Sequence, residues 1–285
     1  MNAEASILLG VATMLGFGVA DFMAKTMLTK GNAIVTAFIS QSIGSLLYLS
    51  AALAYDRAYP SVAIACLALF SGVISGVVLC AYYLALSLGK ASLVAPIFSC
   101  LTVVAVSLSI LILHEALTVL QFSSIGLVFL GVILVAFERK GGEPLSHRLS
   151  LLLALSAAVL GGGNLILQKW IADSEHYLMG FLLSRTSMAI FVGPLAAHGQ
   201  GARSPKTQGS WLKLALLGLI DVSAFFAWYI GLRVGQVSVV TPIATSSPAV
   251  TVVLAHLFLK ERVRLHQQVG ILAILFGIVL LSVVS

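Results

Sequence analysis

Charged residues are scarce in this chain. They make up 9% of its 285 residues, whereas hydrophobic residues make up 60%. Soluble proteins carry about 25% charged residues, and a soluble domain cannot cover so much apolar surface with so few polar groups. The composition therefore excludes a cytosolic enzyme, a disulfide-rich secreted domain and a disordered protein. It predicts an all-α integral membrane protein that crosses the bilayer many times.

Cysteine is also rare, and motifs for cofactor or metal chemistry are missing. Cys66, Cys80 and Cys100 each stand alone in an apolar run, without CxxC or Cys/His spacing. We expect them to be small core residues, and we expect no metal and no cofactor. The sequence also lacks the ATP-binding GxxxxGK[ST] motif, the GxSxG elbow and HExxH. An intramembrane enzyme and an ATP-driven pump are therefore disfavoured.

Long apolar runs are what the sequence has in abundance. One membrane-spanning helix needs roughly 20 residues, and polar breaks divide this chain into ten such runs. We expect spans at 5–25, 33–54, 61–88, 91–113, 119–137, 149–171, 177–197, 211–233, 237–259 and 266–284. A long polar stretch near mid-chain, 138–148, separates two halves of five spans, which we place at residues 1–140 and 141–285.

The two halves repeat one another. At an offset of 146 residues, Tyr83 recurs as Tyr229, Gly89 as Gly235 and Pro96 as Pro242. In the early spans an offset of 144 fits better, and it pairs Lys25 with Lys169. Because five is odd, the second half enters the membrane in the opposite orientation. Inverted repeats are typical of secondary transporters, whose substrate site lies near mid-membrane at the repeat interface.

Basic residues are distributed unequally between the two sides of the expected membrane. The side that holds both termini has three, Arg57, Lys169 and Arg233, and the other side has twelve. The positive-inside rule then predicts a multi-pass protein of the inner or plasma membrane with both termini outside. No basic residue precedes the first span, so we do not expect it to be a cleaved signal peptide. We assign the net charge of +6 to this topology and expect no nucleic-acid partner.

Two matching segments carry a family resemblance. One reads Tyr83-Leu-Ala-Leu-Ser-Leu-Gly89-Lys-Ala-Ser92-Leu-Val-Ala-Pro96-Ile, and the other reads Tyr229-Ile-Gly-Leu-Arg-Val-Gly235-Gln-Val-Ser238-Val-Val-Thr-Pro242-Ile. A glutamate, Glu115 or Glu261, follows each, and the first span contains Gly16-Phe-Gly18-Val-Ala-Asp21-Phe-Met-Ala-Lys25. These motifs resemble the EamA family of the drug/metabolite transporter superfamily over both halves.

The resemblance implies ten transmembrane helices in two inverted five-helix repeats. It also implies a central cavity lined by helices 1–4 and 6–9, and transport of small metabolites, often outward. Leu15 stands where the family usually has Trp, and the family commonly has cytoplasmic termini, whereas the charge bias here predicts termini outside. The repeated glutamates suggest a structural role, either capping a helix or pairing with a nearby base.

Two charged residues fall inside predicted spans. Arg185 is near the centre of 177–197, and Asp221 is near the centre of 211–233. Each costs about 2.5–3.5 kcal/mol at mid-membrane on insertion scales. We expect Arg185 to bind a substrate carboxylate and Asp221 to bind an amine or a proton, or else the two to pair with each other. Their repeat equivalents are Gln41 and Ser75, so Gln41 is a further candidate.

Aromatic and amide residues complete the expected cavity. Asp221, Trp228 and Tyr229 share one helical face, and Tyr82 lies in the corresponding part of the first half. These rings are predicted to wall the cavity, with core packing as the alternative. Asn164 follows three glycines and is a further candidate substrate contact.

Further candidates concern coupling and motion. Asp21 and Lys25 are spaced i, i+4, which favours an intrahelical pair; otherwise Asp21 is a substrate or proton site. His256 is a candidate proton relay, or a histidine held by hydrogen bonds. The prolines predicted to form hinges or kinks are Pro96, Pro242 and Pro248.

The sequence thus favours a secondary transporter, an exporter of small metabolites such as amino acids. It would work by alternating access, with proton coupling or exchange. Hydrophobic cations or drugs and sugar- or nucleotide-type metabolites are alternative substrates, and a pore is a less favoured alternative. The expected partners are a small-molecule substrate and the lipid bilayer, with monomer and homodimer both open.

Overall fold

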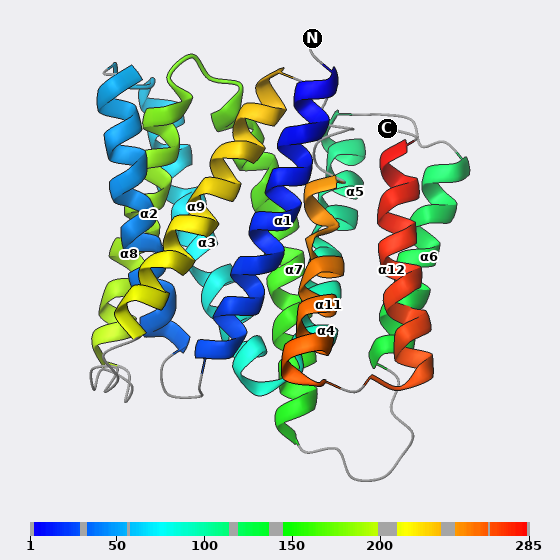
Figure 1. The fold of residues 1–285 in the computed structure, drawn as a ribbon. Helices are drawn as coiled ribbons and strands as arrows, with labels where there is room; N and C mark the ends of the chain where they lie inside the picture. The colour runs from blue at the N-terminus through cyan, green and yellow to red at the C-terminus, as the bar shows by residue number, and fades with distance from the viewer. Residues whose placement is uncertain are drawn as a thin grey trace.

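A computed structural model of the chain describes residues 3–28, 33–55, 58–113, 119–136, 145–198, 210–234, 243–261 and 263–283. Within these ranges the chain is helical and has no strand (Figure 1). The helices are α1 (Ala3–Met27), α2 (Ala33–Tyr55), α3 (Val62–Leu88), α4 (Ala91–Ser99), α5 (Leu101–Leu113), α6 (Val119–Ala136), α7 (Leu145–Ala172), α8 (Tyr177–His198), α9 (Ser210–Val234), α11 (Ser247–Leu259) and α12 (Leu265–Val283).

Six of the described helices are long and apolar enough to cross a membrane. They are found at Leu8–Met27, Ala33–Tyr55, Val62–Leu88, Leu145–Ala172, Tyr177–Ala197 and Trp211–Gly231. Shorter apolar helices lie at Ala91–Ala105, Ile243–Leu259 and Gln268–Gly277. The all-helical membrane fold is therefore confirmed, and the count of ten spanning helices stays a prediction.

The outside of the bundle is more apolar than a soluble protein allows. Large side chains such as Leu46, Phe70 and Ile190 are exposed, while polar Gln41 and Arg185 are buried. This reversal of the usual distribution fits a bundle whose surface meets lipid and whose interior holds the polar groups.

Two predicted spans are broken at equivalent points of the repeat. The span predicted at 91–113 is divided at Cys100 into α4 and α5. The Cys100 amide donates to the carbonyl of Ile97 at 3.1 Å. At the position 146 residues later, the Ser246 amide donates to the carbonyl of Ile243 at 3.2 Å, just before α11 begins. Broken helices at matched positions are typical of transporter folds, where they bring polar backbone to a cavity.

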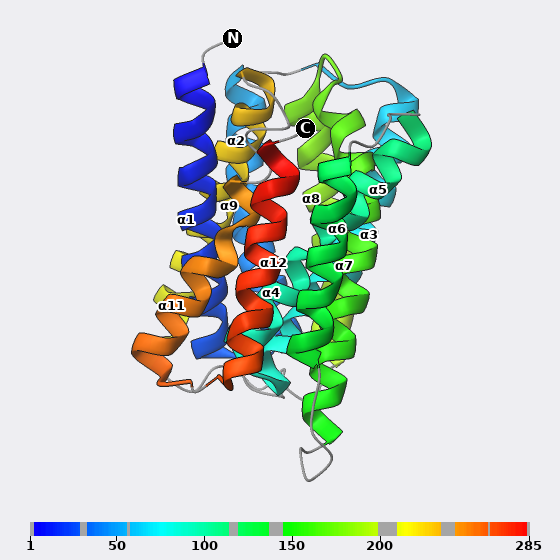
Figure 2. The same ribbon diagram turned by 90° about the vertical axis from the view of Figure 1, so that its right-hand side faces the viewer.

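The two halves pack together through matched helix pairs. α1 packs on α9 and α3 packs on α7, while α1 with α11 matches α7 with α5. α6 and α12 lie side by side at one side of the molecule, away from the other pairs (Figures 1 and 2). α1 begins and α12 ends at the same end of the bundle.

Two glycines in the repeat equivalents α1 and α7 make the same close approach. A Cβ on Gly18 would lie 2.8 Å from the carbonyl oxygen of Ser247, and one on Gly162 would lie 2.5 Å from that of Leu101. Gly18 and Gly162 are 144 residues apart, and Leu101 and Ser247 are 146 apart. The repeat found in the sequence is therefore also a repeat of packing, and each glycine supports one broken helix.

Candidate functional site

A cavity of about 190 Å³ lies in the middle of the bundle. Both halves line it: α1, α2 and α3 contribute, as do α7, α8 and α9, together with residues around the two helix breaks. The lining carries three charged side chains, Asp21, Arg185 and Asp221, beside aromatic and amide groups. Secondary transporters place their substrate sites at such a repeat interface.

Gln41 links the two charged candidates of the second half. Its side-chain carbonyl accepts a hydrogen bond from the Arg185 guanidinium, and its amide nitrogen donates to Asp221 Oδ2 at 3.1 Å. The structure thus joins Arg185 and Asp221 through a neutral amide rather than through a direct ion pair. Gln41 is the repeat equivalent of Arg185, so the repeat places two such groups side by side at the interface.

Aromatic rings hold the guanidinium in place. Arg185 Cζ lies 3.9 Å from the ring centre of Phe225 and 5.9 Å from that of Tyr48. Arg185 is 7% exposed, and it lines the cavity from α8. Stacking on an aromatic face stabilises a cation in a site with little water, so Arg185 is held as a charged group that faces the cavity.

Asp21 and Lys25 do not form the intrahelical pair that their spacing favours. Lys25 Nζ donates to the backbone carbonyls of Leu86, at 2.7 Å, and Gly89. Asp21 lines the cavity one turn earlier on α1. The ammonium group is therefore engaged at the end of α3, and Asp21 adds a carboxylate to the cavity.

A chain of neutral polar groups lies between α3 and α7. Ser71 Oγ donates to Asn164 Oδ1 at 2.8 Å, and Asn164 Nδ2 donates to Ser75 Oγ at 2.8 Å. Gln168 Nε2 also reaches Ser75 Oγ, at 3.4 Å. Asn164, Ser75 and Gln168 line the cavity. The sequence analysis missed Gln168, although it follows Asn164 by four residues and so shares its helical face.

The predicted aromatic residues take two different places. Tyr82 and Trp228 line the cavity, and Tyr82 stacks on Phe98 with ring centres 4.1 Å apart. Tyr229 belongs to the same buried cluster as Trp228 but is not part of the lining. It stacks on Phe181 with ring centres 3.6 Å apart and donates its hydroxyl to Gln168 Oε1 at 3.3 Å. Tyr229 thus supports a residue of the lining rather than forming the wall itself.

Two buried polar groups of the wall, the Tyr82 hydroxyl and the Trp228 indole, have no hydrogen-bond partner among the described residues. Trp228 is 7% exposed, and its indole Nε1 has no hydrogen-bond partner in the part of the chain that the structure describes. Buried polar groups are nearly always paired. An unpaired N–H on a cavity wall therefore points to a ligand or a water molecule as its partner.

The remaining candidates lie apart or outside the described residues. His256 is exposed near the end of α11, where its Nδ1 lies 3.3 Å from the carbonyl oxygen of Glu261. The structure does not bring it to the cavity lining. Pro96 lies inside α4, four residues before the break, and Pro248 is the second residue of α11 and lines the cavity. Pro242 lies outside the described residues.

Comparison with known proteins identifies one family over both halves of the chain. The model of the EamA-like transporter family matches residues 5–137 and 148–283. The uncharacterized transporter YxxF of Bacillus subtilis is 28% identical over 170 residues, which are 59% of this chain and 53% of that protein. An uncharacterized transporter in the cobO 3' region of Sinorhizobium sp. is 30% identical over 97 residues, 34% of this chain and 69% of its own.

Two further similarities concern a shorter relative and a solved structure. An uncharacterized protein of Methanocaldococcus jannaschii is 42% identical over 65 residues, which are 23% of this chain and 47% of that protein. The chain therefore spans about half the length of the Methanocaldococcus protein and of the Bacillus transporter. A crystal structure of a protein with 17% sequence identity matches 97% of this chain and 96% of its own, with a TM-score of 0.66, which shows the same fold.

Proposed function

Because the chain belongs to the EamA-like transporter family, it is a membrane transporter, and we propose that it carries small zwitterionic metabolites such as amino acids. The observation that carries this proposal is the set of charges in one cavity: Arg185 faces the same space as Asp21 and Asp221. A zwitterion offers a carboxylate and an ammonium group, which complement one cation and an acid. The cavity volume of about 190 Å³ suits a small molecule.

Arg185 is the carboxylate-binding group in this proposal. A guanidinium has five N–H donors in a fixed fork that matches a carboxylate, and the bond to Gln41 occupies one of them. Phe225 supports the guanidinium plane at 3.9 Å. A substrate carboxylate therefore meets a donor group that is already oriented, which reduces the entropy lost on binding.

Asp21 is the ammonium-binding group. Asp221 already accepts a hydrogen bond from Gln41. Lys25, the lysine nearest to Asp21 on α1, donates to a carbonyl at the end of α3 instead of pairing with Asp21. Asp21 lines the cavity with Tyr82 and Phe17, whose rings are suited to a cation. Two carboxylates against one guanidinium also leave room for a bound proton, so Asp21 and Asp221 are the groups for proton coupling in the cavity.

A cationic drug-like substrate is the second candidate. The excess of acid over base among the charged lining residues, together with the aromatic wall, favours it. A purely cationic substrate, however, has no negative group to pair with the buried Arg185 in the lining. The zwitterion therefore accounts for more of the lining.

The mechanism proposed is alternating access driven by a gradient or by exchange, in the direction of export. Ten spanning helices in two inverted repeats, with both termini outside, complete the proposal. The paired helix breaks at Cys100 and Ser246 support it, because broken helices at a repeat interface are a common device of secondary transporters.

Counterflow into proteoliposomes tests the proposal. Vesicles are preloaded with one unlabelled metabolite from a panel of amino acids, organic cations and sugars, and uptake of the labelled compound is followed with and without a pH gradient. We expect saturable uptake of amino acids that Arg185→Ala abolishes and Lys169→Ala leaves intact, because Lys169 is in an exposed ion pair with Asp173. Counterflow of organic cations alone, retained in Arg185→Ala, would overturn the zwitterion in favour of the second candidate.

A further inference from the structure

The ammonium group of Lys25, which belongs to α1, caps the carboxyl-terminal end of α3. It donates to the carbonyl oxygens of Leu86, at 2.7 Å, and Gly89. The last carbonyls of a helix have no partner within the helix and carry the negative end of the helix dipole. A lysine from α1 therefore satisfies the carboxyl end of α3.

The carboxylate of Glu261, in the second half of the chain, caps the amino-terminal end of α4. It accepts from the backbone amides of Ala91 and Ser92 at 3.2 and 3.0 Å, and from Ser92 Oγ at 2.7 Å. These are the first amides of α4, where the dipole favours a negative charge. Lys260, in the left-handed conformation with φ 51°, ends α11 just before Glu261.

The contacts of Lys25 and Glu261 both hold the turn between α3 and α4, one on each side of it. α3 ends at Leu88 and α4 begins at Ala91, so the chain reverses between a lysine-capped carboxyl end and a glutamate-capped amino end. Lys25 belongs to the first repeat and Glu261 to the second. We name this pair of contacts the Lys25–Glu261 clamp.

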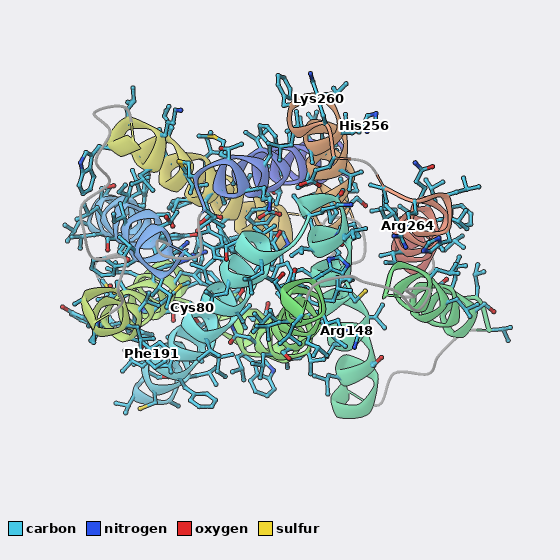
Figure 3. All side chains as sticks on the ribbon, turned by 90° about the horizontal axis from the view of Figure 1, so that it is seen from below. Cys80, Arg148, Phe191, His256, Lys260 and Arg264 are labelled. Carbon is cyan, nitrogen blue, oxygen red and sulfur yellow. The ribbon has the colours of Figure 1, made fainter. Side chains whose placement is uncertain are left out.

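Behind the clamp, the bundle is tightly packed. Ala24 and Ala255 are fully buried beside the clamp residues, and Leu86, Leu93 and Val94 are at most 1% exposed. The cavity begins on the other side of this layer, where Ala95, Phe98 and Ser99 line it. At the same end α7 and α12 begin and α11 ends (Figure 1), which places Arg148, Lys260 and Arg264 there; Figure 3 views the bundle from this end and labels the three residues.

We propose that the Lys25–Glu261 clamp closes the cavity on the cation-rich side of the membrane and releases the α3–α4 turn when the cavity opens there. This inference rests on the transport function, since only a transporter must open both ends in turn. Asp21 in the cavity and Lys25 in the clamp share α1 and lie one turn apart. A substrate that contacts Asp21 therefore acts on the helix that carries half of the clamp.

The repeat provides a matched control at the other end. Lys169 is the equivalent of Lys25, and its Nζ lies 3.3 Å from Asp173 Oδ2 on the surface, with 42% of the lysine side chain exposed. An exposed pair of this kind contributes little to stability, because water and salt screen it. In this structure, therefore, Lys25 caps a helix of the bundle, whereas Lys169 makes a local surface pair. The repeat counterparts of Glu261 and Ser92 are Glu115 and Ser238, and both lie outside the described residues.

Thiol labelling tests the clamp without any substrate. Ser99 lines the cavity, so Ser99→Cys, with the three native cysteines changed to alanine, is the reporter. A membrane-impermeant methanethiosulfonate reagent is applied to right-side-out and to inside-out vesicles. Arg148→Cys in the same background reports which preparation exposes the clamp end.

We expect slow labelling of the reporter from the clamp end in the parent protein. Lys25→Met and Glu261→Gln should raise that rate about tenfold, the effect of a 1.4 kcal/mol shift between two states, and lower the rate from the opposite end. Lys169→Met should change neither rate. The reciprocal change separates a clamp from a general loosening, which would raise both rates.

Unchanged labelling in Glu261→Gln, with an unchanged melting temperature, would overturn the inference, as would a rise from both ends. If Lys25→Met does not fold, Ser92→Ala replaces it, since it removes one Glu261 contact and keeps the backbone bonds. Failure of amino-acid counterflow alongside the expected labelling would reject the proposed substrate and leave the clamp standing.

Discussion

Lys25 lies one helical turn from Asp21 on α1, but its ammonium group is bonded to the carbonyls of Leu86 and Gly89. An acid followed by a lysine at i+4 ordinarily forms a local pair. Here the lysine caps the end of α3 instead, and Asp21 lines the cavity. The separation of these two charges gives the cavity its second carboxylate and gives the bundle its clamp.

Asp21→Asn tests the first consequence. Removing this charge should weaken binding of an ammonium-bearing substrate at least about tenfold, which corresponds to roughly 1.4 kcal/mol. Concentration dependence of counterflow measures the change. Asp173→Asn is the control, because Asp173 is exposed and pairs with Lys169 on the surface. An unaltered half-saturation in Asp21→Asn would contradict the role of Asp21.

Gln41→Leu tests the bridge between Arg185 and Asp221. Leucine has a similar volume but removes both hydrogen bonds, so two buried charged groups lose their shared partner. We expect a loss of about 1–3 kcal/mol in stability, seen as a lower melting temperature in detergent, together with weaker transport.

Gln41→Glu is the complementary change. It keeps the shape and places a carboxylate on Arg185, but it also places a second carboxyl group against Asp221, which loses the hydrogen bond from Gln41 Nε2. The two carboxyl groups must then share a proton, and the new pair with Arg185 should displace the carboxylate of a substrate. Transport by Gln41→Glu at the parent rate would show that Arg185 does not bind the substrate.

The sequence predicted the repeat, and the repeat predicted much of the site. The membrane class, the family and the deep positions of Arg185 and Asp221 followed from apolar runs and from an alignment of the chain with itself. Gln41 was identified as the repeat equivalent of Arg185. These features depend on residue type and order along the chain, which the sequence displays directly.

What the sequence could not predict depends on contacts across the repeats. The spacing of Asp21 and Lys25 favours a local pair, and only the packing of α1 against the α3–α4 turn shows that Lys25 bonds elsewhere. A continuous helix was expected at 91–113, because an apolar run does not show where its hydrogen bonds change register. For Glu261 the sequence suggested a capping role, but the helix it caps lies 169 residues away.

Gly162→Ala tests the packing that supports one broken helix. A Cβ there would lie 2.5 Å from the carbonyl oxygen of Leu101, so the backbone of α5 or α7 must shift. Overpacking of this kind costs about 1–3 kcal/mol, which should lower the melting temperature. Gly163→Ala is the control: its nearest neighbour is Leu108 Cδ1 at 3.9 Å. Alanine there should be neutral or stabilising by up to about 1 kcal/mol, and equal melting temperatures for both variants would refute the close approach.

Trp228→Phe tests whether the unpaired indole N–H of the cavity wall binds the substrate. Phenylalanine keeps an aromatic ring beside Tyr229, which stacks on Trp228 with ring centres 5.4 Å apart, but it removes the buried Nε1–H. A substrate whose side chain accepts a hydrogen bond should lose about tenfold in affinity, since such a bond contributes about 1 kcal/mol or somewhat more. A substrate with an apolar side chain should lose little.

Competition among labelled and unlabelled amino acids in counterflow measures that difference. Trp170→Phe is the control, because Trp170 is 43% exposed on the outside of α7 and should leave the selectivity unchanged. If Trp228→Phe weakened apolar and polar substrates equally, the indole would serve only as a packing surface. The selectivity would then rest on the neutral polar groups of the lining, Asn164, Ser75 and Gln168, whose hydrogen bonds to one another this substitution leaves in place.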